Sequence, residues 1–288
     1  MRDYILMSDS TTDLPVDVVR KMGVKIIPFS YSVNDITREH YLDERDDVKA
    51  FYNDLREGSM PVTSQVNPTQ YKEYFEKTVK EGKDIIYICF SSGLSGSYQS
   101  AILGKDMLVE EYPDAHIEII DSLCASVGEG ILLYLAATLK DNGMDMESLA
   151  KWIENSKHRI RHWFMVEDLF HLSRGGRLSA VGALVGSALK IKPILTVDEQ
   201  GKLVVKAKAR GTNKALDYIL SMVEAEGGNL GEQIVVIGHA DDPGKAEKLK
   251  AMVMEQGVKE KNIMLTTINP IIGSHVGAGM TAIGFLMP

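Results

Sequence analysis

Short apolar segments of strand length alternate with helical patterns through the first half of the chain, and this alternation limits the fold more than any other feature. The strand-like segments are Tyr4–Met7, Lys25–Phe29, Asp84–Phe90 and Ile117–Ile120. Strands that are apolar on both faces and separated by helices are typical of a parallel sheet covered on both sides. The first half therefore predicts an α/β fold with a mostly parallel sheet flanked by helices.

Local signals mark where several of the intervening helices begin and end. A helix is predicted near Pro15–Met22, with Asp13 as its N-cap and Gly23 as its stop. Asn67 followed by Pro68 predicts an N-cap and a first helical residue, because proline lacks the N–H that is unsatisfied at that position in any case. Both signals support regular helices between the strands.

The second half has a different pattern. Two apolar segments, Pro193–Val197 and Leu203–Ala209, flank an Asp-Glu-Gln-Gly turn and predict an antiparallel hairpin. Helices are expected near 212–226 and 243–256, around a strand at Ile234–Gly238, with edge strands at Thr266–Ile268 and Thr281–Leu286. The change of pattern near 155–165 predicts two α/β domains, residues 1–160 with a mostly parallel sheet and residues 161–288 with a mixed sheet.

Composition excludes several classes of protein. The chain has 288 residues, 44% of them hydrophobic and 25% charged, which is ordinary for a globular protein. Its longest strongly apolar segment, Ile131 to Ala137, is far too short for an integral membrane segment. A formal net charge of −8 argues against nucleic acid as a partner. With only Cys89 and Cys124, a disulfide framework is not expected, and a cytoplasmic location is predicted.

Three short motifs of hydroxyl, glycine and histidine residues lie far apart in the sequence, at 61–68, 91–97 and 273–279. The first two precede predicted helices, where free backbone N–H groups favour an anion. Thr63 and Ser64 belong to the first motif, and Ser95 and Gly96 to the second. Each set of hydroxyls alone is also explained by helix capping. Together they favour a site for one small negatively charged group, and they include neither a metal-binding cluster nor a general-base carboxylate.

His275 lies between glycines in the third motif, in a segment expected to be a loop that enters the last strand. A histidine there is suited to hydrogen bonding with a carboxylate or to proton transfer, although a purely structural role is an open alternative. Hydrolase chemistry by Ser95 and His275 has weak support. The segment Gly93–Gly96 lacks the Gly-x-Ser-x-Gly spacing, and no Asp or Glu occurs in the fourteen residues before His275 or anywhere after it.

Arginine and lysine residues mark two further segments. Arg177 follows a glycine pair and precedes a predicted small-residue helix over 178–189. Lys206, Lys208 and Arg210 alternate with apolar residues, which predicts a strand with one cationic face. That face is either simply solvated or a docking patch for a nucleotide-carrying partner. The polar segment 9–13 after the first strand is expected to have a structural role, and Cys89 to be an inert core thiol.

Six of these segments occur in an order that resembles the DegV family of bacterial fatty-acid-binding proteins, which includes the binding subunits of fatty acid kinase. The match extends nearly from end to end. It rests on residues 8–15, Thr63-Ser64-Gln65 with Pro68, residues 92–100, Gly175–Leu178, Lys192–Leu195 and Gly273–Gly277. Each pattern is weak alone, and their shared order makes the resemblance specific.

The resemblance implies two α/β domains with an acyl chain between them. It implies that Thr63 and Ser95 hold the carboxylate of a long-chain fatty acid such as palmitate, stearate or oleate, with His275 close by. Arg177, Arg210, Ser64 and Gly96 would serve the head group or kinase docking. The protein would then be a non-enzymatic carrier in phospholipid metabolism. It would need no other cofactor and would present its ligand to the ATP-binding subunit of a fatty acid kinase.

Two other functions remain open on the residues alone. One is a stand-alone hydrolase or phosphotransferase that uses Ser95 and His275. The other is a lipid sensor that binds a fatty acid without passing it on. The chain contains no Walker-type glycine-rich lysine motif, so we expect ATP for any phosphoryl transfer to come from a partner.

Overall fold

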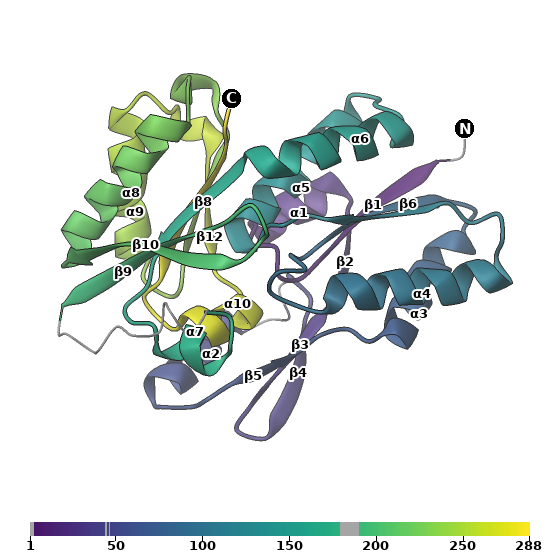
Figure 1. The fold of residues 1–288 in the computed structure, drawn as a ribbon, viewed down its shortest axis with the longest axis horizontal. Helices are drawn as coiled ribbons and strands as arrows, with labels where there is room; N and C mark the ends of the chain where they lie inside the picture. Colours follow the sequence, from purple (N-terminus) through teal and green to yellow (C-terminus); the bar gives the residue numbers. More distant parts are fainter. Residues whose placement is uncertain (1–2, 44, 46, 179–189) are drawn as a thin grey trace.

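The computed structural model describes residues 3–43, 45, 47–178 and 190–288, and it has a mixed α/β architecture with three sheets in that part of the chain. Two lobes lie side by side, and the described ends of the chain are on different lobes (Figure 1). The small-residue helix predicted over 178–189 lies outside the described residues, apart from Leu178.

The first sheet is parallel throughout, as the apolar segments predict. Its strands are β1 (Tyr4–Asp9), β2 (Lys25–Ile27), β6 (Asp84–Cys89) and β7 (Ile117–Asp121), in the order β2-β1-β6-β7. One face is covered by α3 (Pro68–Val79) and α4 (Ser97–Glu111). On the other lie α1 (Val16–Met22), α5 (Ser126–Asp141) and α6 (Met146–Ser156) (Figure 1).

The second sheet is mixed and has six strands in the order β10-β9-β8-β13-β11-β12. They are β8 (Ile160–Met165), β9 (Ile191–Val197), β10 (Leu203–Arg210), β11 (Val235–His239), β12 (Ile263–Thr267) and β13 (Thr281–Leu286). The β9–β10 hairpin confirms its prediction. The prediction of Thr281–Leu286 as an edge strand is wrong, because β13 lies between β8 and β11 and is buried from Thr281 to Phe285.

Helices cover both faces of the mixed sheet. α8 (Thr212–Glu226) and α9 (Pro243–Glu255) pack on one face, and α5 packs on the other. α5 therefore contacts the second sheet as well as α1 and α6 of the first lobe. The division at residue 160 stays a prediction, although the strands of the mixed sheet all come from residues 160–286.

A small antiparallel sheet, which the sequence patterns do not predict, lies below the junction of the lobes. It contains β3 (Phe29–Val33), β4 (Ile36–His40) and β5 (Val62–Ser64), in the order β4-β3-β5. The predicted strand Lys25–Phe29 is divided at Pro28 between β2 and β3. Near this sheet lie α2 (Val48–Arg56), α7 (Phe170–Arg174) and α10 (Pro270–Val276) (Figure 1). Short 3-10 turns occur at Lys157–Arg159, Leu230–Glu232 and Glu260–Asn262.

Two of the predicted helix signals are confirmed and one is wrong. Asn67 Oδ1 accepts a hydrogen bond from the Gln70 backbone N–H, and Gln70 Oε1 accepts one from the Asn67 backbone N–H. The two bonds form a capping box at the start of α3. Gly23 ends α1 with a left-handed φ of 62°. Asp13 does not cap α1. Its carboxylate instead accepts hydrogen bonds from Ser126 Oγ at 2.6 Å and the Asn269 amide at 2.7 Å, and so joins three distant segments.

The polar segment after β1 has the structural role predicted for it, and it encloses two acidic side chains. Thr11 Oγ1 lies 2.5 Å from Asp9 Oδ1 and 2.7 Å from Glu129 Oε2, with all three residues fully buried. A hydroxyl has one hydrogen, so Thr11 donates to one carboxyl and the other must donate to Thr11. Asp9 also accepts from Tyr87 and the Phe90 amide, which favours its ionised form. Glu129 is therefore the protonated partner, consistent with burial raising its pKa well above 4.5.

We expect Glu129→Gln to reduce the dependence of stability on pH. In the wild type the folded state keeps a proton that the unfolded state releases near pH 4.5, so the free energy of unfolding falls as pH rises through the raised pKa. The glutamine amide donates to Thr11 without titrating. Urea unfolding between pH 5 and 9 should show a shallower decline for the variant, whereas parallel curves would contradict a protonated Glu129. Glu110→Gln, at an exposed position of α4, is the control.

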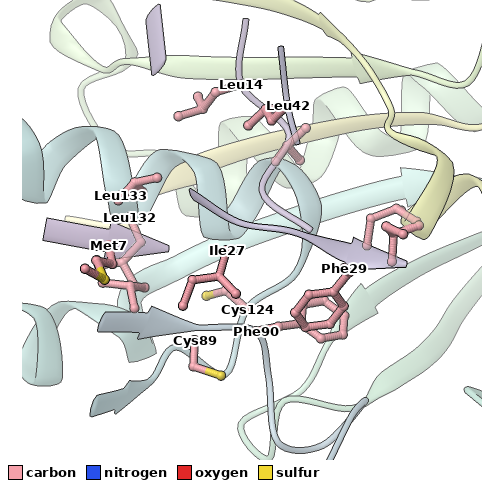
Figure 2. Close-up of a cluster of buried hydrophobic side chains, with 14 of the residues drawn as sticks. Met7, Leu14, Ile27, Phe29, Leu42, Cys89, Phe90, Cys124, Leu132 and Leu133 are labelled. Carbon is pink, nitrogen blue, oxygen red and sulfur yellow. The ribbon is translucent and has the colours of Figure 1, made fainter. Parts of the chain in front are cut away.

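The core between the lobes is apolar. Phe29 and Phe90 meet edge to face with ring centroids 6.5 Å apart, beside Ile27 (Figure 2). Cys89 and Cys124 are both buried free thiols, and Cys89 is a core residue as predicted. Burial raises the pKa of both thiols well above 9.0, so neither forms a reactive thiolate at neutral pH.

Candidate functional site

A hollow of about 410 Å³ lies between the lobes, within the ~300–1,000 Å³ range of small-molecule sites. Its walls come from the small sheet, the loop after β6, the start of α5, the mixed sheet and α10. The described apolar side chains that line it include Phe29, Phe90, Leu94, Val127, Phe164, Leu172, Val197, Leu203, Ile271, Ile272, Val276, Met280 and Ala282. The polar lining is concentrated in Thr63, Ser64, Gln65, Ser95, Arg177 and His275, with Ser126 and His162 elsewhere.

Thr63 and His275, which are 212 residues apart in the chain, meet in this hollow. Thr63 lies on β5, where pairing with Tyr31 of β3 fixes its direction, and its Oγ1 is 2.9 Å from His275 Nε2. The Nδ1 atom of His275 is buried and has no hydrogen-bond partner among the described residues. Because a buried unpaired N–H costs free energy, the geometry favours the tautomer with hydrogen on Nε2, which donates to Thr63. The hydroxyl hydrogen of Thr63 is then free to point at a ligand.

His275 is not in a loop as expected, because residues Pro270–Val276 form α10 and His275 lies in its last turn. Asn269 caps this helix by accepting from the Ile272 amide, and Asn269 is itself held by Asp13. Burial lowers the pKa of His275 to about 4, with further contributions from Arg177 and Arg174. The imidazole is therefore neutral near pH 7, and the pair of Thr63 and His275 contributes uncharged donors to the cavity.

The second motif contributes Ser95 from the loop between β6 and α4. Ser95 Oγ accepts from the Ser97 amide at 3.2 Å and lies 2.8 Å from Ser97 Oγ. Gly96 precedes the first residue of α4, and a side-chain carbon there would lie 2.7 Å from the Gln65 amide oxygen. Glycine at this position therefore lets Gln65, which the sequence reasoning passed over, reach the cavity.

The expectation that a helix N-terminus helps to bind an anion holds for α4 and not for α3. Ser95 and the start of α4 lie at the cavity, where the positive end of a helix dipole favours an anion. The first turn of α3 is satisfied by its own capping box, and no residue of α3 is among the described lining residues. The first motif therefore reaches the site through the β5 hydroxyl of Thr63, with Ser64 beside it.

The two arginines singled out from the sequence are in different places. Arg177 lines the cavity, where its guanidinium donates to the carbonyls of Leu94 at 3.2 Å and Gly175 at 2.6 Å. Arg210 is exposed at the end of edge strand β10 and is not among the described lining residues. Lys206 and Lys208 are exposed on the same strand, whose apolar residues are half-buried, as the alternation predicts.

The apolar lining was the part of the site that sequence reasoning could not assign, because its residues have the same patterns as ordinary core residues. The hydrolase alternative gains no support from the geometry. His275 Nε2 pairs with Thr63, and Ser95 pairs with Ser97, so within the described part of the chain no hydrogen bond joins a serine nucleophile to the histidine. Among the described residues, no cluster of three or more His, Cys, Asp or Glu is arranged to hold a metal ion. None of the helices in the described ranges has the length and apolar character needed to cross a bilayer.

Comparisons with known proteins agree with the fold. Residues 5–287 match the family described as "Uncharacterised protein, DegV family". A DegV domain-containing protein from Clostridium perfringens is 40% identical over 286 residues, which cover 99% of this chain and 98% of the relative. A DegV family protein from Thermus thermophilus, described by its fatty acid binding, has a TM-score of 0.89 at 26% identity, with both chains fully covered. A DegV family protein from Ruminococcus gnavus, solved with vaccenic acid, has a TM-score of 0.87 at 26% identity, with 98% of this chain and 99% of that one covered.

Proposed function

The chain belongs to the DegV family, and on that premise we propose that it binds a long-chain fatty acid in the cavity between its lobes and presents the carboxylate to an ATP-dependent fatty acid kinase. Thr63 and Ser95 bind the carboxylate, and His275 orients Thr63. The observation that supports this most directly is a mainly apolar hollow in which the hydroxyls of Thr63 and Ser95 lie with the neutral imidazole of His275. An amphiphile with one small polar head has the matching shape and polarity.

Most of the affinity comes from the acyl chain. Burial of about fifteen carbons at ~0.8 kcal/mol each amounts to roughly 12 kcal/mol before the costs of ordering are subtracted. The head group consequently needs positioning more than strong binding. This fits a site whose arginine, Arg177, already donates to two backbone carbonyls.

Uncharged donors also suit the reaction that follows. A carboxylate held by the hydroxyls of Thr63 and Ser95 keeps more of its nucleophilicity than one paired with a guanidinium, and positioning supplies much of the catalysis in phosphoryl transfer. A carboxylate oxygen attacks the γ-phosphorus of ATP bound to the partner. The new O–P bond forms as the bond to the β-phosphate oxygen breaks, which gives an acyl phosphate and ADP. Arg177, the exposed Arg210, Ser64 and Gly96 serve the head-group region or kinase docking.

The ligand should remain bound through purification. Native mass spectrometry of the full chain, followed by lipid extraction, is expected to show one C14–C18 acid per protein, and a protein that neither retains nor takes up such acids would contradict the proposal. With ATP and a fatty acid kinase ATP-binding subunit added, hydroxylamine should trap an acyl phosphate. Binding without this transfer would indicate a lipid sensor, and ester or phosphate turnover without a partner would indicate a hydrolase or phosphotransferase.

The docking role of Arg210 is separable from ligand binding. We expect Arg210→Ala to leave fatty acid affinity unchanged, because Arg210 lies outside the described cavity lining, while it reduces kinase-dependent acyl phosphate formation. Arg20→Ala, at an exposed position on α1, is the matched control. Equal transfer rates for the two variants would remove Arg210 from the docking surface.

A further inference from the structure

The strand register of the mixed sheet arranges part of the cavity wall in rows. Phe164 of β8 is opposite Ala282 of β13, and His162 is opposite Gly284. His162 and Phe164 are two residues apart, so both side chains point to the same face, and both line the cavity. On the other side of β8, Trp163 pairs with Thr196 of β9. Val197 is the next residue of β9 and continues the His162 row.

These rows give the cavity a direction. The chain leaves α10, which carries His275, and reaches the cavity-lining residues Met280 and Ala282 before it reaches Gly284. Met280 and Ala282 are therefore nearer to α10 along the chain than Gly284 is. Successive rows are about 6.6 Å apart, since each residue of a strand advances ~3.3 Å. Among the rows of the mixed sheet that line the cavity, the His162 row is therefore the one farthest along β13 from α10 and His275, and the far end of an acyl chain whose carboxylate lies beside His275 would reach it.

The start of α5 holds the imidazole of His162 at this end. A side-chain carbon at Gly128 would lie 1.8 Å from His162 Nδ1, so the ring occupies space that only glycine leaves open. His162 Nδ1 is 3.3 Å from the Ala125 carbonyl and donates to it. Beside the ring, a carbon at Gly284 would lie 2.8 Å from the Val127 carbonyl, so helix backbone already fills that part of the row. Burial lowers the pKa of His162 to about 4, and the wall it forms is uncharged.

A second hollow of about 670 Å³ lies beyond this row and opens toward solvent. Of its described lining residues, His162 and Val197 also line the inner cavity. The remainder includes Leu123, Ile160 and Trp163, together with charged side chains at the outer rim. The imidazole of His162 and the isopropyl group of Val197 are therefore walls that the apolar cavity and the outer hollow have in common.

We propose that His162, together with Val197, is the stop that limits the length of the acyl chain, and that removal of the imidazole joins the cavity to the outer hollow. This inference rests on the proposed function and names the residues that determine chain length at the same site. With the imidazole present, added methylenes have no apolar space beyond the His162 row. With it removed, they extend past β8 toward Leu123 and Ile160.

The test compares the affinities of saturated acids from C12 to C22 for the wild type and His162→Ala, measured on delipidated protein by displacement of a fluorescent fatty acid. Wild-type affinity should rise to a maximum at one chain length and fall beyond it. In the variant the maximum should move by two or more carbons toward longer chains, with a gain of about tenfold for each two methylenes that become accommodated. His158→Ala, which changes a histidine that lines only the outer hollow, should keep the wild-type profile.

A second substitution makes the result independent of how well His162→Ala folds. Val197→Ala should move the maximum in the same direction by a smaller amount, and Val197→Phe should move it toward shorter chains. If the wild type binds fatty acids and neither folded variant at 162 or 197 changes the length profile, the stop is elsewhere. If the wild type binds no fatty acid of any length, the proposed function itself fails.

Discussion

Replacement of Thr63 by valine together with Ser95 by alanine should lower fatty acid affinity by roughly 10²- to 10⁴-fold, because each hydrogen bond to a charged group contributes ~1.5–3 kcal/mol. Valine keeps the shape of threonine, so the loss reports the hydroxyl and not a cavity in the wall. In the variant, His275 Nε2 also loses its partner at 2.9 Å. Isothermal titration of the delipidated protein with palmitate measures the change.

Two comparisons separate a head-group effect from a general defect. The methyl ester of the same acid, which carries no negative charge, should bind the wild type and the double variant within a few-fold of each other. The pair Thr267→Val and Ser92→Ala removes the same two hydroxyls from exposed positions, one on β12 and one in the loop of Ser95, and should leave palmitate binding intact. A double variant at 63 and 95 that binds palmitate as tightly as the wild type would refute the carboxylate assignment.

Ala282→Phe should abolish long-chain binding, because it places an aromatic ring in the middle of the cavity. Ala282 is 1% exposed, lies opposite Phe164 in the register and lines the hollow. We expect at least a ~100-fold loss of affinity for C16 and C18 acids, since the methylenes beyond the ring lose their burial of ~0.8 kcal/mol each. Native mass spectrometry of the purified variant should show protein without lipid.

The same variant must remain folded for this result to be informative. Overpacking of a filled core costs about 1–3 kcal/mol, whereas a ring that enters an empty cavity costs less. Chemical unfolding of the delipidated proteins should therefore give similar free energies of unfolding. Ala209→Phe, on the same sheet but packed toward the α8 side, is the matched control and should retain its lipid. Full lipid occupancy in Ala282→Phe would show that the acyl chain does not lie in this hollow.

Local signals predicted the helices and strands well where short-range chemistry decides them. Asn67-Pro68 predicted the start of α3, and the same Asn-Pro signal at Asn269 marks the start of α10. The glycines around His275 predict a loop, whereas the Asn269-Pro270 pair starts a helix that reaches Val276 and includes His275. The position of β13 inside the sheet had no comparable local signal, because the pairing partners β8 and β11 are supplied by distant segments.

The sequence by itself determined the alternation of strands and helices, the hydroxyl and histidine residues worth testing, and the resemblance to a family. Caps, turns and periodicity act between residues a few positions apart, so they can be read from the order of residues. Only the tertiary structure decided that Thr63 meets His275, that Arg210 lies away from the cavity lining, and that His162 stands between two hollows. The physical reason is that a cavity is space left between separately formed elements. Its apolar lining has the same sequence pattern as a filled core, and only the packing distinguishes the two.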